Sequence, residues 1–357
     1  MVRTTKAPSA ALTWLVVGSR YMPVYIALVL LVIVAAVWAP AALGSVPLRA
    51  IAPYGAVLAI TALGQVLVIM TGGIDLSVPG TMSLAAVIMI GVGAGSDENI
   101  GMAIAVALVA AAVVGSVNGI LIGGLKLNAL IVTLAMGLIV IGVVNRYGRT
   151  FPVQNPVPEG WSDWVATRIL GVSAVFWVGL GLTIVVSVVL RYTAVGRRFQ
   201  VVGANPVASG VVGVRVNLNQ ILAYVVAAVL YAIAGLALAG LIRRPGVYVG
   251  SEYLLAPIAA VVIGGASLTG GLASPFSTFA AAFFLTGLNQ LMLTIGLPTS
   301  LQFVVFGLVI IGGMLVSGDR IIRGVEHLLR ERRRPDASQP QTIDASTEGR
   351  AGKEARM

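Results

Sequence analysis

The sequence contains no cysteine and only one histidine, which excludes several kinds of site from the start. Disulfides, thiolate zinc sites and thiol nucleophiles all require cysteine. No G-x-x-x-x-G-K-[ST] motif occurs, so the chain lacks the usual loop that cradles nucleotide phosphates. Carboxylates and His327 nowhere fall at metal-ligand spacing, and no nucleophile is accompanied by a base. We therefore predict no metal site, no catalytic residues and no cofactor bound by this chain.

Charged residues are also scarce, at 10% of the chain against about 25% in an average protein, while 58% of residues are hydrophobic. So few charges cannot cover the water-facing surface of 357 residues, which indicates a membrane protein. The 43 glycines suit close helix packing in lipid. The net charge of +10 does not indicate a nucleic-acid partner, because the basic residues flank apolar runs or lie in the C-terminal tail.

Apolar run lengths and flanking helix breakers predict an all-α, polytopic membrane protein with about ten transmembrane helices. The predicted spans are residues 22–39, 50–70, 78–95, 102–123, 128–145, 172–190, 220–241, 254–268, 274–295 and 299–316. The spans 78–95 and 254–268 are short and rich in glycine, so whether they cross completely stays open. Broken or re-entrant helices are the alternative, which lipid tolerates only where protein or a water-filled cavity covers the freed backbone.

The placement of lysine and arginine predicts that both termini are cytoplasmic. Residues 1–21 then form a cytoplasmic N-terminal segment, and residues 22–318 form the transmembrane domain. The connection 191–219, which carries four arginines, lies on the same side. The polar and charged tail 319–357 is predicted to be cytoplasmic and largely disordered.

Asp75 is the one carboxylate close to a membrane span that does not lie in an obvious loop. Glycines before it and Pro79 after it predict a broken helix. Its carboxylate either accepts backbone N–H bonds near Ser77, capping the next helix, or contacts a transported solute directly. The glycines predicted to break helices, here and at the end of a second apolar run, are Gly72, Gly73, Gly264 and Gly265.

Other polar side chains interrupt apolar runs and form a predicted substrate path together with Asp75. They are Gln65, Ser77, Asn118, Asn128, Thr133, Asn289 and Gln290. Each either makes an interhelical hydrogen bond, typically worth about 0.6–2 kcal/mol in membranes, or binds a hydroxyl of a solute. Several amides with a single acidic group favour a neutral polyol over an ion or a proton relay.

The connection 191–219 contains Gly196, Arg197 and Arg198, followed by the stretch Gly203-Ala204-Asn205-Pro206. Asn205 and Pro206 predict the start of a short amphipathic helix, with the proline at its first helical position. Such a helix either docks in the groove of a partner or forms part of a solvated loop.

Four segments, in the same order, resemble the permease subunits of ribose-type ATP-binding-cassette importers. Residues 72–78 (GGIDLSV) resemble the GGIDLSVG signature of that family, and residues 117–134 resemble its N-G…LKxNPFIVTL segment. Residues 196–208 resemble its cytoplasmic G-R-x-x-x-x-x-G-x-N-x-x-A-A loop, and residues 258–271 resemble IAAVVLGGTSLSGG. Together the motifs cover about 65–280.

The resemblance also implies the location and the partner subunits of this chain. Such permeases lie in the bacterial inner membrane, form homodimers or pair with a sister permease, and sit on a separate ATPase subunit that uses the ATP. A periplasmic or lipid-anchored binding protein delivers a monosaccharide to them. Residues 196–208, with Gly196, Arg197, Arg198, Gly203, Asn205 and Pro206, would then couple the permease to its ATPase.

The chain departs from the family pattern at two places, so the identity of the transported solute stays open. Pro79 stands where the family usually has glycine or another small residue, and Tyr253-Leu254-Leu255-Ala256-Pro257 replaces a Y-E-L-D-A stretch and lacks its acidic residues. The alternative function is a secondary transporter or channel for a small polar solute. Such a protein needs ion-coupling groups within its spans, where only Asp75 is available.

Overall fold

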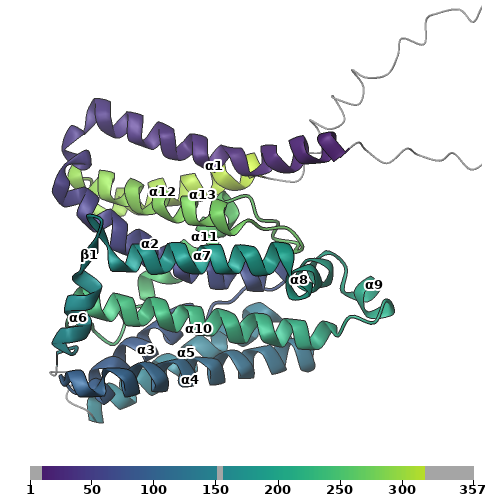
Figure 1. Ribbon diagram of the computed structural model, residues 1–357, viewed down its shortest axis with the longest axis horizontal. Helices are drawn as coiled ribbons and strands as arrows, with labels where there is room; N and C mark the ends of the chain where they lie inside the picture. Colours follow the sequence, from purple (N-terminus) through teal and green to yellow (C-terminus); the bar gives the residue numbers. More distant parts are fainter. Residues whose placement is uncertain (1–9, 151–155, 318–357) are drawn as a thin grey trace, which may run out of the picture. The chain divides into compact units, whose positions relative to one another are not determined.

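The computed structural model describes residues 10–150 and 156–317, and these are almost entirely helical (Figure 1). The long helices are α1 (Ala10–Trp38), α2 (Ser45–Met70), α4 (Ile100–Gly119), α5 (Ala129–Thr150), α7 (Ala174–Tyr192), α10 (Val216–Ile242), α12 (Pro275–Thr294) and α13 (Thr299–Ser317). The shorter helices are α3 (Val78–Gly93), α6 (Glu159–Ala166), α8 (Ala194–Ala204), α9 (Pro206–Val211) and α11 (Ala256–Ile263). Brief helical turns are η1 (Pro40–Leu43), η2 (Asp97–Asn99), η3 (Ile120–Gly124, π-helical) and η4 (Ser251–Tyr253). A small antiparallel hairpin joins β1 (Arg168–Ile169) to β2 (Val172–Ser173), with Arg168 opposite Ser173.

Seven helices of the described residues are long and apolar enough to cross a membrane, and three shorter apolar helices accompany them. These segments fall on the predicted spans, which confirms the all-α, polytopic class. The first helix begins earlier than predicted, at Ala10, although its membrane-compatible stretch begins only at Arg20. The predicted disordered tail, 319–357, lies outside the described residues.

The third and eighth predicted spans are broken crossings, not complete helices. α3 has 16 residues and α11 has 8, which correspond to about 24 Å and 12 Å of helix at 1.5 Å per residue. Neither reaches the roughly 30 Å of a hydrocarbon core. Irregular chain precedes each of them, residues 71–77 before α3 and residues 243–255, which include η4, before α11.

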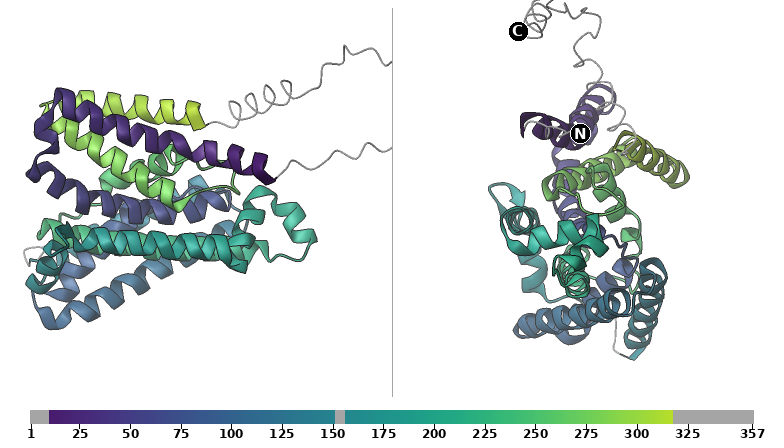
Figure 2. Two further views of the ribbon diagram at one scale, coloured as in Figure 1. Left: turned by 45° about the horizontal axis from the view of Figure 1, so that its top comes forward. Right: turned by 90° about the vertical axis from the view of Figure 1, so that its right-hand side faces the viewer.

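The helices α2 and α10 form the centre of the bundle. α2 contacts α10, α12, α7 and α11, while α10 also contacts α4 and α3. α2 is largely buried, whereas α10 keeps one exposed face with Leu218, Leu222 and Val226. Figure 2 shows α1 and α13 at one edge of the bundle and α4 and α5 at the opposite edge.

Glycines at four-residue spacing on α4 and η3 let these helices pack tightly on α10. A Cβ at Gly115 would lie 2.5 Å from the carbonyl oxygen of Tyr224, and one at Gly119 would lie 2.7 Å from Ile221 Cα. Gly123, one turn further, faces the carbonyl oxygen of Asn217. In lipid, apolar side chains gain no free energy by leaving the equally apolar lipid tails. Helices therefore associate through stripes of small residues such as this one, which let their backbones approach closely.

The two ends of the bundle carry different elements (Figure 1). We call the end beyond which α8 and α9 lie the α8 end, and the end covered by α6 and the β1–β2 hairpin the α6 end. Arg20 belongs to the α8 end, because its Nε donates to the carbonyl of Gly265 (2.7 Å) and the neighbouring Gly270 contacts Gly203 of α8. The basic loop 191–219 and Arg20 therefore share one end, as the predicted orientation requires.

Candidate functional site

The first broken crossing starts where α2 ends. Thr71 closes α2, and Gly72 then adopts a left-handed conformation (φ 84°) that favours glycine. The following chain runs in non-helical conformation until α3 begins at Val78, with Pro79 in its first turn. The break predicted from these glycines and this proline is therefore present.

The returning segment lies along the last turns of α2 and is held there by Gln65. The Gln65 carboxamide faces the backbone of Asp75, with its nitrogen 3.3 Å from the carbonyl oxygen and its oxygen 3.2 Å from the amide nitrogen. The hydroxyl of Tyr231, from α10, forms a further hydrogen bond to the same carboxamide (3.0 Å). This pairing replaces the hydrogen bonds that a continuous helix would supply.

The carboxylate of Asp75 organises the turn into α3. Its Oδ1 accepts hydrogen bonds from the backbone N–H of Ser77 (2.8 Å) and from the Ser77 hydroxyl (2.6 Å). The amide of Asn118, on α4, donates to the Ser77 hydroxyl (3.0 Å). Asp75 thus bonds Ser77, the residue immediately before α3, whereas the helix itself has no side-chain cap.

Thr133 of α5 holds the other side of the segment. Its hydroxyl accepts from the backbone N–H of Leu76 (2.9 Å) and donates to the carbonyl of Ala129 (2.8 Å). Gly137, one turn further along α5, approaches the carbonyl of Leu76 so closely that a Cβ would lie 3.1 Å away. Side chains from four helices thereby fix one short stretch of irregular chain.

Five predicted path residues meet in this network: Gln65, Asp75, Ser77, Asn118 and Thr133. All five are fully buried, so in this conformation none lines an open path. Two oxygens, Asp75 Oδ2 and Asn118 Oδ1, are buried without a hydrogen-bond partner among the described residues.

Three further predicted residues lie outside the network. Asn128 is exposed before α5, where its Oδ1 accepts from the N–H of Leu130 (2.9 Å). Asn289 and Gln290 are half-buried on α12, next to Leu291, which packs against α1.

The second broken crossing meets the first inside the bundle. Between α10 and α11, the chain turns inward so that Gly250 contacts the carbonyl of Pro79. The N–H of Gly250 donates to the hydroxyl of Ser83 on α3 (3.0 Å). From there α11 runs towards the α8 end, where Gly264 and Gly265 (φ 85°) end it as predicted.

Sequence reasoning missed Tyr224, Tyr231, Ser83 and Gly250. The two tyrosines lie two turns apart on the same face of α10 and are buried (1% and 0% exposed), with the Asp75 carboxylate within electrostatic reach of both phenols. They are the only phenols in an otherwise apolar span, which was the available signal. Gly250 carried no such signal, because its partner is distant in sequence.

The loop 191–219 contains two helices where one was predicted. The missed helix, α8, is capped by Thr193, whose hydroxyl accepts from the N–H of Gly196 (3.3 Å). Gly196 packs directly on the backbone of Leu190, which leaves no room for a side chain. Arg197 and Arg198 are exposed on the outer side of α8.

The C-terminal end of α8 touches both broken crossings. Gly203 lies against the carbonyl of Met70, the last residue of α2, and a Cβ there would also lie 2.6 Å from the nitrogen of Gly271. Gly271 in turn donates its N–H to the Met70 carbonyl (3.0 Å). One residue of α8 therefore contacts the chain at the start of one broken crossing and just beyond the end of the other.

The second helix, α9, begins as predicted. Asn205 caps it by accepting from the N–H of Ala208 (2.9 Å), and Pro206 occupies the first turn. Three valines on or next to this helix, Val207, Val211 and Val212, are 77–84% exposed. An apolar tip that faces no other described element suits contact with another protein.

We expect Asn205→Ala to loosen α9 without disturbing the membrane domain. The substitution removes a helix cap, which typically costs about 1 kcal/mol. Hydrogen exchange of residues 206–211 should accelerate by about fivefold, while exchange in α10 stays unchanged. Unchanged exchange in α9 would show that the cap contributes nothing.

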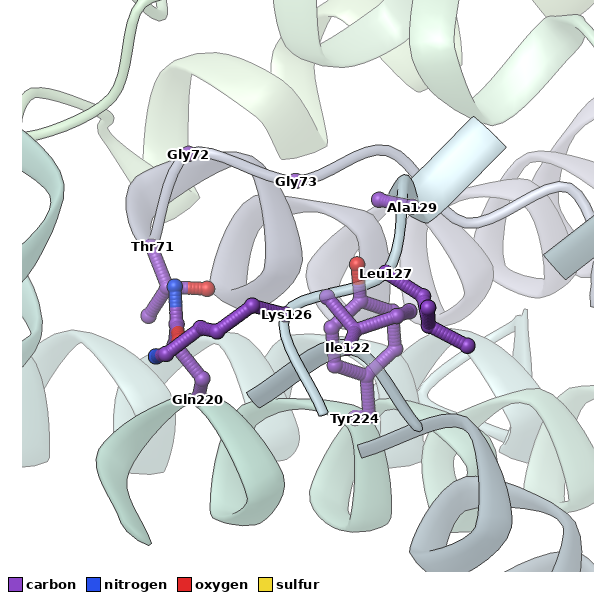
Figure 3. Close-up of a pocket in the computed structure, with 9 residues that line it drawn as sticks. All are labelled: Thr71, Gly72, Gly73, Ile122, Lys126, Leu127, Ala129, Gln220 and Tyr224. Atoms are coloured by element: carbon purple, nitrogen blue, oxygen red, sulfur yellow. The ribbon is translucent and has the colours of Figure 1, made fainter. Parts of the chain in front are cut away.

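A cavity of about 230 Å³ opens between residues 71–73, the loop after η3 and α10 (Figure 3). Lys126 and Gln220 stand at one side of it, and the ring of Tyr224 forms part of its wall. Because residues 71–73 directly follow Met70, the cavity borders the chain that α8 contacts.

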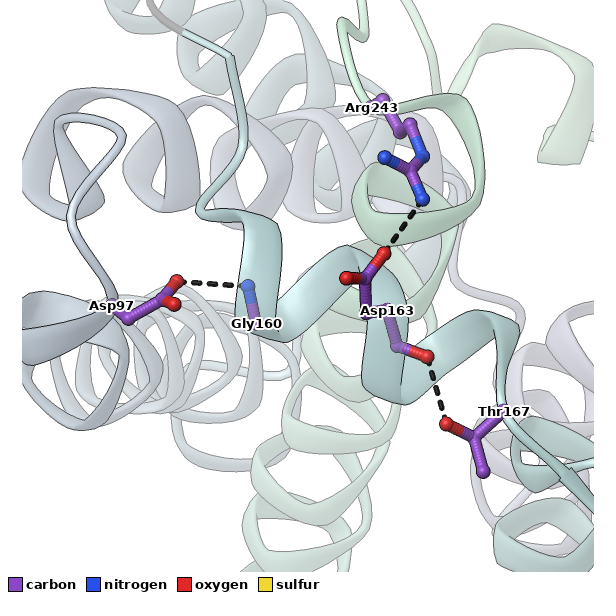
Figure 4. A network of polar contacts seen from close by, with 5 residues as sticks. All are labelled: Asp97, Gly160, Asp163, Thr167 and Arg243. Carbon is purple, nitrogen blue, oxygen red and sulfur yellow. Dashed lines mark hydrogen bonds and ion pairs between the residues drawn. The ribbon is translucent and has the colours of Figure 1, made fainter.

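The α6 end is closed by polar contacts around α6 (Figure 4). Asp97 accepts from the N–H of Gly160 (2.8 Å), and Arg243 forms an ion pair with Asp163 (2.8 Å). Trp161 donates its indole N–H to the carbonyl of Leu236 on α10 (2.9 Å). These contacts attach α6 to α10 and to the turn before α4.

We expect the Arg243–Asp163 ion pair to contribute little to stability. Its side chains are 56% and 69% exposed, and exposed pairs typically contribute about 0–1 kcal/mol. Asp163→Asn should lower the melting temperature of the purified protein by no more than about 2 °C. A drop of 10 °C would contradict this assignment.

Seven long apolar helices and three shorter ones among the described residues define a polytopic membrane protein. The sequence matches the family described as branched-chain amino acid transport system/permease component over residues 47–314, and the chain belongs to this family. Members of this family are transport subunits that carry no catalytic activity and bind no cofactor themselves. They work with an ATPase and a binding protein.

Individual relatives are of similar length. The chain is 32% identical to the ribose import permease protein RbsC of Escherichia coli over 73% of this chain and 82% of the relative. It is also 32% identical to the autoinducer 2 import system permease protein LsrC of Klebsiella pneumoniae, over 84% and 87%. A probable permease protein, y4mJ, of Sinorhizobium fredii matches at 32% over 82% and 87%. No solved structure matches the chain.

Proposed function

We propose that this chain is the membrane-spanning subunit of an ATP-driven importer that moves a monosaccharide, or a closely related small hydroxylated solute, into the cytoplasm. The relatives named for ribose import and autoinducer 2 import support a small polar solute. The buried network of amides and hydroxyls around Asp75 supports an uncharged one. Uptake measurements with different sugars identify the particular solute.

The observation that carries the proposal is the contact of Gly203 with both broken crossings. A partner that displaces α8 moves the carbonyl of Met70 and the N–H of Gly271 together. The crossings meet again inside the bundle, where Gly250 contacts Pro79. Movement of α8 is thereby transmitted to the irregular chain at the core, which is the linkage that a transporter driven by a separate ATPase requires.

The orientation follows from charge. Arg20, Lys126 and the arginines of the loop 191–219 gather at the α8 end, since Arg20 bonds Gly265 and Lys126 bonds Asn217 and Gln220 at the start of α10. By the positive-inside rule this end is the cytoplasmic one. Both termini are then cytoplasmic, in the bacterial inner membrane. The ATPase docks on α8 and α9 through the exposed valines and arginines, and the binding protein docks at the α6 end.

Opening of the network exposes the proposed substrate path. When the returning segment shifts away from α2 and α4, Asp75 Oδ2 and Asn118 Oδ1 become available to sugar hydroxyls, because neither has a partner among the described residues. Gln65, Ser77 and Thr133 then offer the remaining hydrogen bonds. Asn289 and Gln290, on α12, belong to the part of the path nearer the α6 end. A second permease subunit, identical or a sister chain, completes the assembly in the lipid.

Transport in proteoliposomes tests the proposal. The permease is reconstituted with the ATPase and binding protein encoded beside its gene, with ATP inside and labelled ribose outside. Uptake should require the ATPase, ATP and the binding protein together. If ribose fails, the sugar that the binding protein binds replaces it. Uptake that proceeds without the ATPase and follows an ion gradient would establish the alternative, a secondary transporter or channel.

A further inference from the structure

The cavity beside residues 71–73 is lined by a mixed set of groups. Lys126, Gln220 and Thr71 provide its polar side, whereas Ile122 and Leu127 provide an apolar side. The ring of Tyr224 lies between the two (Figure 3). Binding sites for small molecules combine a few placed polar groups with apolar and aromatic walls in this way.

Lys126 is positioned at a conformational cost. Its backbone is left-handed (φ 58°), which is uncommon for a residue with a side chain and is typical of functional positions. The ammonium donates to Asn217 Oδ1 (2.6 Å) and Gln220 Oε1 (3.2 Å). An ammonium has three protons, so one remains for a ligand. Because Gln220 uses its oxygen on Lys126, its NH₂ group supplies further donors.

Two hydroxyls add hydrogen-bond acceptors. The hydroxyl of Thr71 donates to the carbonyl of Val68 (2.9 Å), which leaves its lone pairs to accept. The hydroxyl of Tyr224 is buried against Gly73 and has no hydrogen-bond partner among the described residues. A buried phenol without a partner is costly, and a ligand or water that reaches it would remove that cost.

This combination matches a neutral sugar. Sugar hydroxyls both donate and accept, and the C–H faces of the ring suit Tyr224 and the aliphatic wall. Among the described residues no carboxylate lines the cavity, so none of these groups selects a cation. The positive charge of Lys126 is shared between two amide oxygens, so an anion is not required either.

We infer that this cavity binds the imported sugar from the α8 side and that its occupancy slows further transport. The inference rests on the proposed function. A ligand in the cavity touches residues 71–73, and Met70, one residue earlier, contacts Gly203 of α8. Occupancy therefore restrains the chain that must move when α8 moves, so accumulated product inhibits its own import.

The test uses the reconstituted importer, in neutral phosphatidylcholine vesicles preloaded with ATP and graded concentrations of unlabelled ribose. The initial rate of uptake of labelled ribose should fall as the internal ribose rises. Lys126→Met should raise the half-inhibitory concentration by about tenfold or more, the loss expected for a hydrogen bond from a charged donor, and Gln220→Leu by about threefold to tenfold, the loss expected for a hydrogen bond between neutral groups. Lys126→Arg should restore part of the inhibition.

The matched control is Arg49→Met, which removes an exposed positive charge from the first turns of α2, away from the cavity. Its inhibition curve should equal that of the unaltered protein. Robust uptake that is insensitive to internal ribose overturns the inference and leaves the proposed function intact. The inference is also overturned if internal ribose inhibits the unaltered protein, Gln220→Leu and Lys126→Met equally. Inhibition only by ribose phosphate, or only when anionic lipid is added, would assign the cavity to an anion instead.

Discussion

Gly203→Leu is expected to separate ATP hydrolysis from transport. A leucine at this position collides with the carbonyl of Met70 and the backbone of Gly271, neither of which is a flexible side-chain end. Overpacking of this kind costs about 1–3 kcal/mol. If this cost applies to the arrangement in which α8 packs against Met70 and Gly271, that arrangement is less populated, and uptake falls by about ten- to a hundredfold. The ATPase should continue to hydrolyse ATP.

Uptake and ATP hydrolysis are measured side by side in the same proteoliposomes. Gly181→Leu on α7 is the matched control, because a Cβ at Gly181 meets nothing within 4 Å. This variant should transport at the normal rate. Normal coupled uptake by Gly203→Leu would refute the assignment of α8 as the element that transmits ATPase movement to the broken crossings.

Asp75→Ala is expected to destabilise the membrane domain by about 3 kcal/mol. The substitution leaves the buried N–H and hydroxyl of Ser77 without their acceptor, and each buried unsatisfied group costs about 1–3 kcal/mol. The melting temperature should fall by several degrees, and hydrogen exchange in residues 74–78 should accelerate. The effect should be local at first, because α2 and α10 keep their other contacts.

Asp75→Asn is the control, since an asparagine oxygen accepts the same two hydrogen bonds. It should keep most of the stability that alanine loses. An alanine variant as stable as the unaltered protein would contradict the anchoring role. Loss of uptake in a fully stable Asp75→Ala protein would instead assign the carboxylate to direct contact with the solute.

Local chemistry was sufficient for much of the prediction. Runs of about 20 apolar residues gave the spans, because a membrane permits little else. Gly72, Gly73 and Pro79 gave the break before α3, since left-handed backbone and a missing N–H are local properties. Asn205 and Pro206 gave the start of α9 in the same way.

The prediction was weaker where partners are distant in sequence. α8 was missed because its buried side is defined by contacts with α7, α10 and the end of α2, which are not visible in the local sequence. The predicted span 254–268 was longer than α11, mainly because its C-terminal residues follow Gly264, where the helix ends. Tyr231 acquires its role only through Gln65, 166 residues away.

The sequence by itself determined a polytopic helical protein, its breakpoints and its family, because these depend on composition and on motifs a few residues long. Only the tertiary structure decided that five predicted path residues form one closed network, and that Asn289 and Gln290 stand apart. It also decided that the two broken crossings meet each other and that α8 touches both. The physical reason is that irregular chain inside a membrane must find hydrogen-bond partners, and those partners lie on helices that only the fold brings near.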